Sequence, residues 1–179
     1  AALRELKPLL LATADLAERL RLITNAVVRI FDADFARIWV LKAAELCESG
    51  CRHAAASEGE SACRDRTRCL HLMASSGRYA RIDGSHRRVP LGAYKIGRIA
   101  SAEEPWFVSN DVAQDPRIHD RAWAAALGLV AFAGCRLISR EGSPVGVLAF
   151  FGTRPVTPAE LTLLQDLAVT ASQVVLIGT

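Results

Sequence analysis

Four of the five cysteines lie in one short polar stretch, and this clustering is the strongest constraint that the sequence places on the fold. They are Cys47, Cys51, Cys63 and Cys69, and the residues between them include almost no large apolar side chain. Such a segment cannot offset the entropic cost of ordering its backbone by burying apolar surface. Thiolates are soft metal ligands, and four of them can complete a tetrahedral site. The pattern therefore predicts that a bound metal ion orders this segment.

The spacing of the cysteines leaves the nature of that site open. Cys47 and Cys51 are separated by three residues, as in many zinc sites, whereas Cys63 and Cys69 are separated by five, and no common ferredoxin spacing matches. We expect zinc, with an iron–sulfur cluster as the alternative, and with disulfides or unbridged thiols as a third possibility.

Three further residues near this pattern are interpreted as structural. His53 is interpreted as a polar loop residue and His71, between two leucines, as a residue on the exposed face of a strand, so both are left out of the ligand set. Cys135 lies in an apolar run and is predicted to be a small buried thiol on a strand.

Charge and hydropathy exclude several classes of partner. The net charge of the 179 residues is +3, with acidic and basic side chains intermingled, so neither a nucleic-acid stripe nor a basic membrane-binding face is expected. There is no basic-then-apolar leader and no apolar run approaching the ~20 residues of a membrane span. We therefore expect a single domain in a reducing cytoplasm, where clustered cysteines favour metal over disulfide.

The two ends of the chain carry helical patterns. Apolar residues at alternating steps of three and four predict a helix capped by Asp15 and running to about Phe31, and the segment 157–179 is a second apolar helical pattern. Residues 1–14 are expected to form a separate helix or linker whose leucines meet a partner helix. The chain begins without methionine and looks excised from something longer. These features predict a homodimer formed through the terminal helices.

Between the terminal helices the sequence alternates strands with short helices. Strands are predicted at residues 35–42, 70–77, 106–110, 129–139 and 143–152, the last two joined as a hairpin by the turn at 140–142. Short helices are predicted at 96–104 and before Gly128. The result is an α+β fold with one mainly antiparallel sheet, and the cysteine-bearing segment, about 43–69, is an insertion between the first two strands.

The order of these segments resembles a GAF domain, the small-molecule sensing module of bacterial signalling proteins. The resemblance rests on the Gly97 helix, the PWFVSND strand and turn, the hairpin with its PVGVL return, and the final helix after Thr157, and it covers residues 15–179. It implies a central antiparallel sheet with the N- and C-terminal helices on one face and a ligand pocket on the other. It also implies a downstream output domain, as in two-component kinases, cyclases or transcription activators. The cysteine-bearing insertion departs from the family pattern.

The resemblance further implies which residues are near a small-ligand pocket. By matching position these are Tyr94, Ile96, Trp106, Phe107, Asn110, Asp111, Trp123, Phe132 and Arg136. For the aromatic members core packing is an equally good interpretation, and Asn110 and Asp111 are also typical of a turn.

Subtypes of the family differ in ligand and in activity. Segment 109–111 matches the cyclic-nucleotide motif too slightly, Cys135 is the only candidate for bilin attachment, and His119 is a poor haem ligand, so none of these ligands is predicted. The enzymatic alternative is the GAF-fold reductase of free methionine sulfoxide, which uses cysteine nucleophiles. Four cysteines in one polar loop suit coordination better than that chemistry, and no other catalytic motif is present. We expect a non-catalytic sensor.

Overall fold

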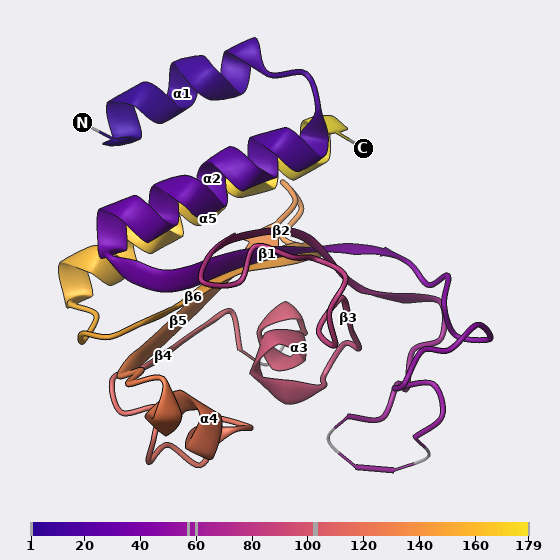
Figure 1. The fold of residues 1–179 in the computed structure, drawn as a ribbon. Helices are drawn as coiled ribbons and strands as arrows, with labels where there is room; N and C mark the ends of the chain where they lie inside the picture. Colours follow the sequence, from indigo (N-terminus) through magenta and orange to yellow (C-terminus); the bar gives the residue numbers. More distant parts are fainter. Residues whose placement is uncertain (1, 57, 60, 102–103, 179) are drawn as a thin grey trace.

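Six antiparallel strands and five helices make up the part of the chain that the computed structural model describes, residues 2–56, 58–59, 61–101 and 104–178. Figure 1 shows the strands as one layer with helices on both sides. The helices are α1 Ala2–Ala12, α2 Leu16–Phe31, α3 Tyr94–Ala100, α4 Arg121–Ala126 and α5 Pro158–Gly178. The strands are β1 Ala33–Ala43, β2 Arg68–Gly77, β3 Arg88–Val89, β4 Trp106–Ser109, β5 Ala131–Ile138 and β6 Pro144–Gly152. The predicted α+β fold with a central antiparallel sheet is confirmed.

The sheet has the strand order β3-β2-β1-β6-β5-β4, so that β1 and β6 lie at its centre. Close approach of these two strands requires a glycine, because a Cβ at Gly146 would lie 2.3 Å from the Trp39 carbonyl oxygen. β5 and β6 form the predicted hairpin, with Phe132 opposite Phe151. The apolar residues of the central strands can therefore point toward the helices on either side of the sheet.

One face of the sheet is covered by α2 and α5, with α1 packed outside α2 (Figure 1). The Asp15 carboxylate accepts a hydrogen bond from the Glu18 backbone N–H and so starts α2, and the helix ends at Asp32, whose φ is 50°. The leucines of residues 1–14 were expected to meet a partner helix. Leu6 of α1 is instead buried in this layer, whereas Leu9 is exposed. Dimerisation through the terminal helices stays a prediction.

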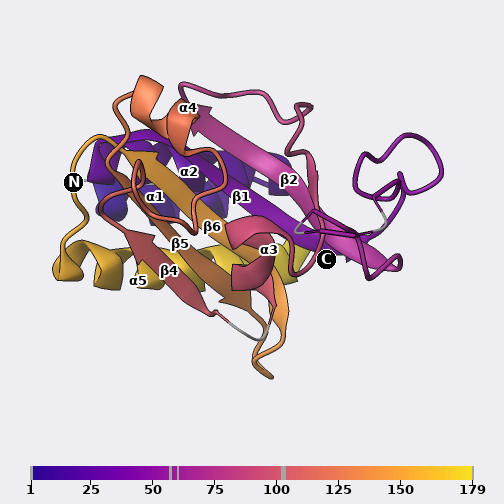
Figure 2. The ribbon, with the colours of Figure 1, turned by 90° about the horizontal axis from the view of Figure 1, so that it is seen from below.

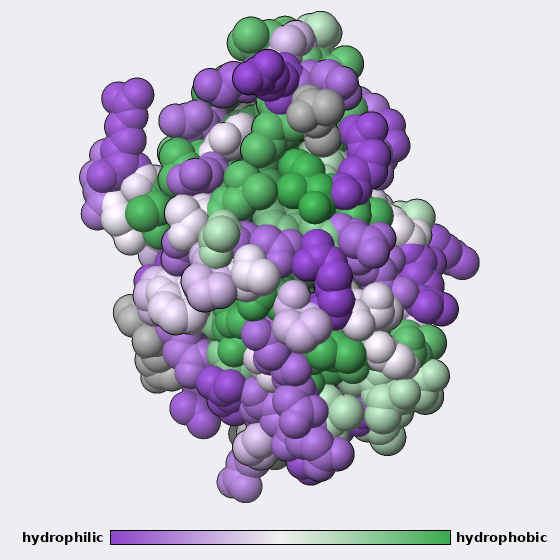
Figure 3. Space-filling view, turned by 90° about the vertical axis from the view of Figure 1, so that its left-hand side faces the viewer, coloured by the Kyte–Doolittle hydropathy of each residue, from purple (hydrophilic) through white to green (hydrophobic). Residues whose placement is uncertain are grey.

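The helix α5 is long and apolar enough, by length and composition alone, to cross a membrane, which the sequence analysis did not anticipate. Core helices pass the same test, and Leu164, Leu167 and Val175 of α5 are buried against the sheet. Figure 3 shows the end of the molecule at the left of Figure 1, where apolar patches are interrupted by hydrophilic side chains.

The opposite face of the sheet carries α3, α4 and their connecting loops, as the view from below shows (Figure 2). A second apolar cluster, which includes Phe35, Ile99 and Phe132, fills the space under these short helices. The described residues 44–56, 58–59 and 61–67, between β1 and β2, project beyond the edge of the sheet as a loop (Figures 1 and 2). The second face therefore combines a hydrophobic floor with irregular walls, the arrangement in which ligand cavities form.

Candidate functional site

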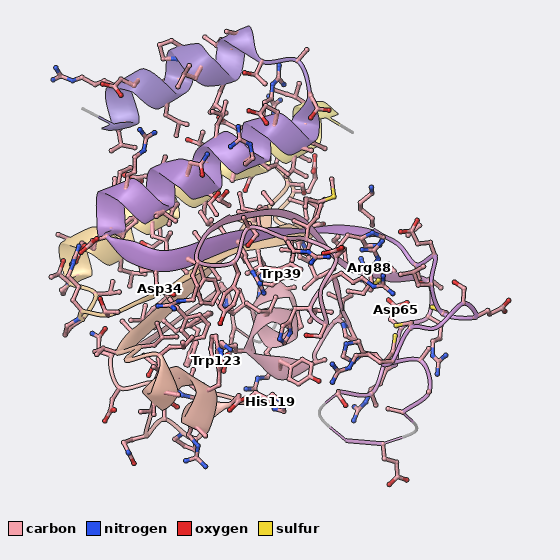
Figure 4. All side chains as sticks on the ribbon, in the orientation of Figure 1. Asp34, Trp39, Asp65, Arg88, His119 and Trp123 are labelled. Atoms are coloured by element: carbon pink, nitrogen blue, oxygen red, sulfur yellow. The ribbon has the colours of Figure 1, made fainter. Side chains whose placement is uncertain are left out.

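A cavity of about 450 Å³ lies on this second face, between the sheet, α3, the start of α4 and the loop at 84–86. Its size is within the range of small-molecule sites. Figure 4 shows Trp39, Trp123 and His119 on the side of the sheet away from α2 and α5. The lining residues are Phe35, Arg37, Trp39, Arg52, Leu72, Tyr79, Arg81, Gly84, Ser85, His86, Val89, Tyr94, Lys95, Ile96, Ile118, His119, Asp120, Trp123, Phe132, Ala149, Phe150 and Phe151. We call this space the aromatic cavity.

The aromatic side chains of the cavity are held in fixed orientations by one another. The Phe35 ring stacks on Phe151 at 5.3 Å between centroids and meets the edge of Tyr79 at 4.9 Å. Trp123 donates its indole N–H to the Tyr79 hydroxyl at 3.2 Å, and Trp39 donates to the His86 carbonyl at 3.0 Å. Rings fixed in this way offer flat apolar surfaces without the entropic cost of ordering long side chains.

Positive charge gathers at the same cavity. Arg37 lies over the rings of Phe35 and Tyr79, at 5.3 and 5.7 Å, and Lys95 lies 5.0 Å from the ring centroids of both Phe132 and Phe151. Burial lowers the pKa of Lys95 to about 8, with a smaller contribution from Arg98. Burial also lowers the pKa of His86 to about 4, followed by repulsion from Arg37 and Lys95. His86 is therefore neutral near pH 7 while the cavity stays positive.

Four of the residues that the family resemblance implied line the aromatic cavity: Tyr94, Ile96, Trp123 and Phe132. Tyr94 begins α3 with a φ of 53°, an unusual backbone conformation for a bulky side chain, and its ring contacts His119 with 4.8 Å between centroids. Strained residues of this kind gather at functional sites because the surrounding structure must hold them in place.

The other five are not among the described residues that line the aromatic cavity: Trp106, Phe107, Asn110, Asp111 and Arg136. Trp106 is 49% exposed on the edge strand β4, and Phe107 packs behind Phe132 at 5.6 Å. The Arg136 guanidinium donates to the Ile99 carbonyl at 2.7 Å and to the Ser101 carbonyl, where it holds the end of α3. The Asp111 carbonyl accepts turn hydrogen bonds from the Gln114 and Asp115 N–H groups.

Asn110 ties two loops together, and its replacement is expected to destabilise the fold rather than to weaken ligand binding. Its amide accepts from the Val156 N–H at 2.7 Å and donates to the Val156 carbonyl at 3.0 Å. Asn110→Ala should lower the free energy of unfolding by about 1–2 kcal/mol in a urea titration, because two hydrogen bonds are lost. Asn110→Asp, which keeps the acceptor, should lose roughly half of that. Equal stability of all three proteins would contradict this role.

Most of the residues that line the aromatic cavity were not predicted from the sequence. Phe35, Arg37 and Trp39 alternate along β1, so strand periodicity could have placed them on one face. Lys95 precedes Ile96 on α3 and gave no such signal. Arg52 and His86 come from irregular loops, whose paths the sequence pattern does not specify.

A second, much smaller cavity of about 10 Å³ is lined by all four clustered cysteines, together with Ala44, Glu45, Leu46, His53, Arg88 and Pro90. The five cysteines of the chain are free thiols. Figure 4 shows sulfur atoms beside the labelled Asp65 and Arg88. The described residues contain no group of three or more Cys, His, Asp or Glu side chains already placed as metal ligands. The four cysteines, which we call the cysteine cluster, therefore border one space without surrounding a coordination geometry.

Burial favours the protonated thiol at two members of the cysteine cluster, Cys63 and Cys69. Burial raises the pKa of Cys69 to about 11, and burial followed by repulsion from Cys47 raises the pKa of Cys63. Cys135 lies apart in β5, where burial raises its thiol pKa to about 12. Among the residues that the structure describes, no cysteine lines the aromatic cavity.

Both neighbouring histidines are buried, which corrects their interpretation as polar surface residues. His71 is 3% exposed, and its Nε2 is 3.0 Å from the Ala43 carbonyl oxygen. His53 is also 3% exposed, with Nδ1 3.0 Å from the Ser61 carbonyl oxygen. Only His53 lines the space between the cysteines, so it is the nearby imidazole that is available to that site.

Comparison with known proteins places this geometry in context. A model of the GAF domain family matches residues 15–175. The GAF domain from Acinetobacter phosphoenolpyruvate-protein phosphotransferase has a TM-score of 0.70 at 17% identity, over 98% of this chain and 91% of that one. The free methionine-R-sulfoxide reductase from Neisseria meningitidis, in complex with its substrate, has a TM-score of 0.67 at 16% identity, over 99% and 87%. No curated protein matches the chain. At these identities the solved structures show a shared fold alone.

Proposed function

Since this chain belongs to the GAF domain family, we propose that it is a sensory or regulatory module that binds a small organic ligand in the aromatic cavity without transforming it. The observation that carries the proposal is the 450 Å³ cavity, whose wall combines contacting aromatic rings with basic side chains. A preformed cavity of this size, with a few polar groups to fix orientation, is typical of ligand sites. Passing a signal to an output domain, and a cytoplasmic location, belong to the same proposal.

The absence of a reactive thiol from the described cavity wall supports a non-catalytic role. A free methionine sulfoxide reductase needs a nucleophilic thiolate that reaches the ligand, whereas burial here raises the pKa values of Cys63 and Cys69, and neither lines the aromatic cavity. Turnover of free methionine sulfoxide by the reduced protein would overturn this part of the proposal.

Filling the aromatic cavity tests the binding proposal. Ala149 of β6 lines the cavity and is 3% exposed, so Ala149→Leu would place a larger side chain in the space where the ligand binds. Metabolites that raise the melting temperature of the wild-type protein should lose that effect in the variant, because a ligand stabilises only the state that binds it. Equal shifts in both proteins would show that the ligands bind elsewhere.

We also propose that the cysteine cluster binds one zinc ion. The small cavity bordered by Cys47, Cys51, Cys63 and Cys69 has a volume of about 10 Å³, which suits one ion and not a large cofactor. Four thiolates are a complete donor set for Zn²⁺, and rotation of the side chains would be needed to close them on it. An iron–sulfur cluster is the alternative for the same thiols, and it would give a brown protein that could sense oxidation.

The environment of Arg88 supports a thiolate site. Arg88 lines the small cavity, is ion-paired with Glu45, and has a buried Nε that lacks a hydrogen-bond partner among the described groups. A buried donor without a partner is uncommon and calls for a specific explanation. A site of four thiolates around Zn²⁺ carries net negative charge, and an adjacent guanidinium would offset it. Metal analysis of protein purified without oxygen distinguishes zinc, iron and no metal.

A further inference from the structure

The charges around the aromatic cavity are unbalanced. Four basic side chains line it, Arg37, Arg52, Arg81 and Lys95, against a single carboxylate, Asp120. That carboxylate accepts the Trp123 N–H at 2.9 Å and so caps α4. Of the basic groups, only Arg81 is ion-paired, with Asp83 at 2.8 Å.

The remaining three cations have no carboxylate partner among the residues that the structure describes. The Arg37 Nε donates to the Ser75 hydroxyl at 3.2 Å, and its other contacts are with aromatic faces. Among the described residues, the Lys95 amine lies over the faces of Phe132 and Phe151. Arg37 and Lys95 are half-buried, whereas Arg52 is exposed. Basic side chains are seldom withdrawn from water without a partner, because the loss of hydration is costly. Their convergence on one cavity indicates that the partner is the ligand.

The shape of the cavity specifies the rest of the ligand. The rings of Phe35, Tyr79, Trp123 and Phe151 contact one another edge to face or stacked, with centroids between 4.9 and 6.3 Å apart. Faces and edges arranged in this way accommodate another planar ring. Lys95 lies at the Phe132 and Phe151 side of this group, where it can meet a negative substituent on such a ring.

We propose that the ligand of the aromatic cavity is a small aromatic carboxylate, whose ring packs among the cavity's aromatic side chains and whose carboxylate pairs with Lys95. Arg37 and Arg52 complete the positive surroundings of the anion. The inference rests on the proposed function and narrows it to one class of ligand. Arg52 comes from the cysteine-bearing loop, directly after Cys51, so this loop contributes to ligand recognition.

Matched acid and amide pairs test the charge requirement directly. Benzoate with benzamide, and indole-3-acetate with indole-3-acetamide, have nearly the same size and ring but differ in charge. Binding is measured near neutral pH by isothermal titration calorimetry and, for the benzene pair, by fluorescence, since Trp39 and Trp123 line the cavity. The acids should bind at least about tenfold more tightly than the amides, because a buried charge-assisted contact contributes more than a neutral one.

Lys95→Met removes the charge and keeps most of the apolar stem, so it should abolish the preference for the acids while the amides bind as before. Lys7→Met makes the same change in net charge on α1, which lies across the sheet from the cavity, and should leave every affinity unchanged. If acids and amides bind equally well in wild type and in Lys95→Met, the ligand class is wrong and the sensory cavity stands. If no acid or amide binds the wild-type protein, this inference is overturned, and the proposed function is decided separately by whether any metabolite stabilises the wild-type protein but not Ala149→Leu.

Discussion

Cys63→Ser is expected to remove stoichiometric metal from the protein and to release the loop at 44–67 from the body of the domain. A serine hydroxyl is a poor ligand for Zn²⁺ at neutral pH, and three thiolates leave the tetrahedron open. Metal content measured by plasma mass spectrometry should fall from about one ion per chain to near zero. Amide hydrogen exchange should accelerate within 44–67, whereas β1 and β2 keep their protection, because the sheet has its own core.

Cys135→Ala is the matched control for this experiment. It removes a buried thiol from β5, outside the cysteine cluster, so the metal content should not change. Cys63→Ser protein that retains a full complement of metal would show that the site is misassigned. Wild-type protein that contains no metal when purified without oxygen would contradict the zinc proposal altogether, and brown protein with iron and sulfide would favour the cluster.

The sheet and its helices were predictable because their signals are local. Aromatic and branched side chains mark β1, the apolar runs and the turn mark the β5–β6 hairpin, and Asp15 marks the start of α2. The local sequence does not determine which side chains of a short edge strand face the core. Trp106 and Phe107 are adjacent on β4, so one must point away from the core, and periodicity alone does not say which.

The cavity was predictable only in part, because long-range folding of loops assembles it. Tyr94 and Trp123 belong to the short helices α3 and α4, and the family resemblance placed both residues near a pocket. Arg52 and His86 reach the same space from loops far apart in sequence, and no spacing rule brings them together. The cysteine cluster shows the reverse case: its residues are obvious in the sequence, whereas the positions of the sulfur atoms depend on a loop without a hydrophobic core.

The two proposed sites share one segment of chain. Cys51 and His53 line the small cavity, and Arg52 between them lines the aromatic cavity. The His53 ring also meets the Tyr94 ring edge-on, with 5.9 Å between centroids. A loop held by metal would fix Arg52 relative to α3, so order at the cysteine cluster and recognition in the aromatic cavity are expected to depend on each other.

Burial of the Lys95 charge lowers the stability of the folded protein, and such a penalty is expected where function requires a residue. Its pKa is lowered to about 8, against 10.5 for an ordinary lysine, by burial and then by Arg98. Below about pH 8 the amine is charged in the folded and unfolded states alike, and the full penalty of burying the charge is present. As pH rises from about 8 to above 10.5, the folded state releases its proton first, and the penalty disappears.

Lys95→Met should therefore stabilise the ligand-free protein near pH 7 by about 2–3 kcal/mol. The substitution removes the penalty of burying the charge, and from this gain the lost contact of the amine with two aromatic rings is subtracted. Urea unfolding of both proteins near pH 7 and above pH 10 measures the gain, which should shrink at the higher pH. His86 stays neutral across this window, because burial and then repulsion from Arg37 lower its pKa to about 4, so it does not reverse the trend. Lys7→Met should change stability by less than about 0.5 kcal/mol. A destabilised Lys95→Met protein, or a gain independent of pH, would show that Lys95 carries no burial penalty for a ligand to relieve.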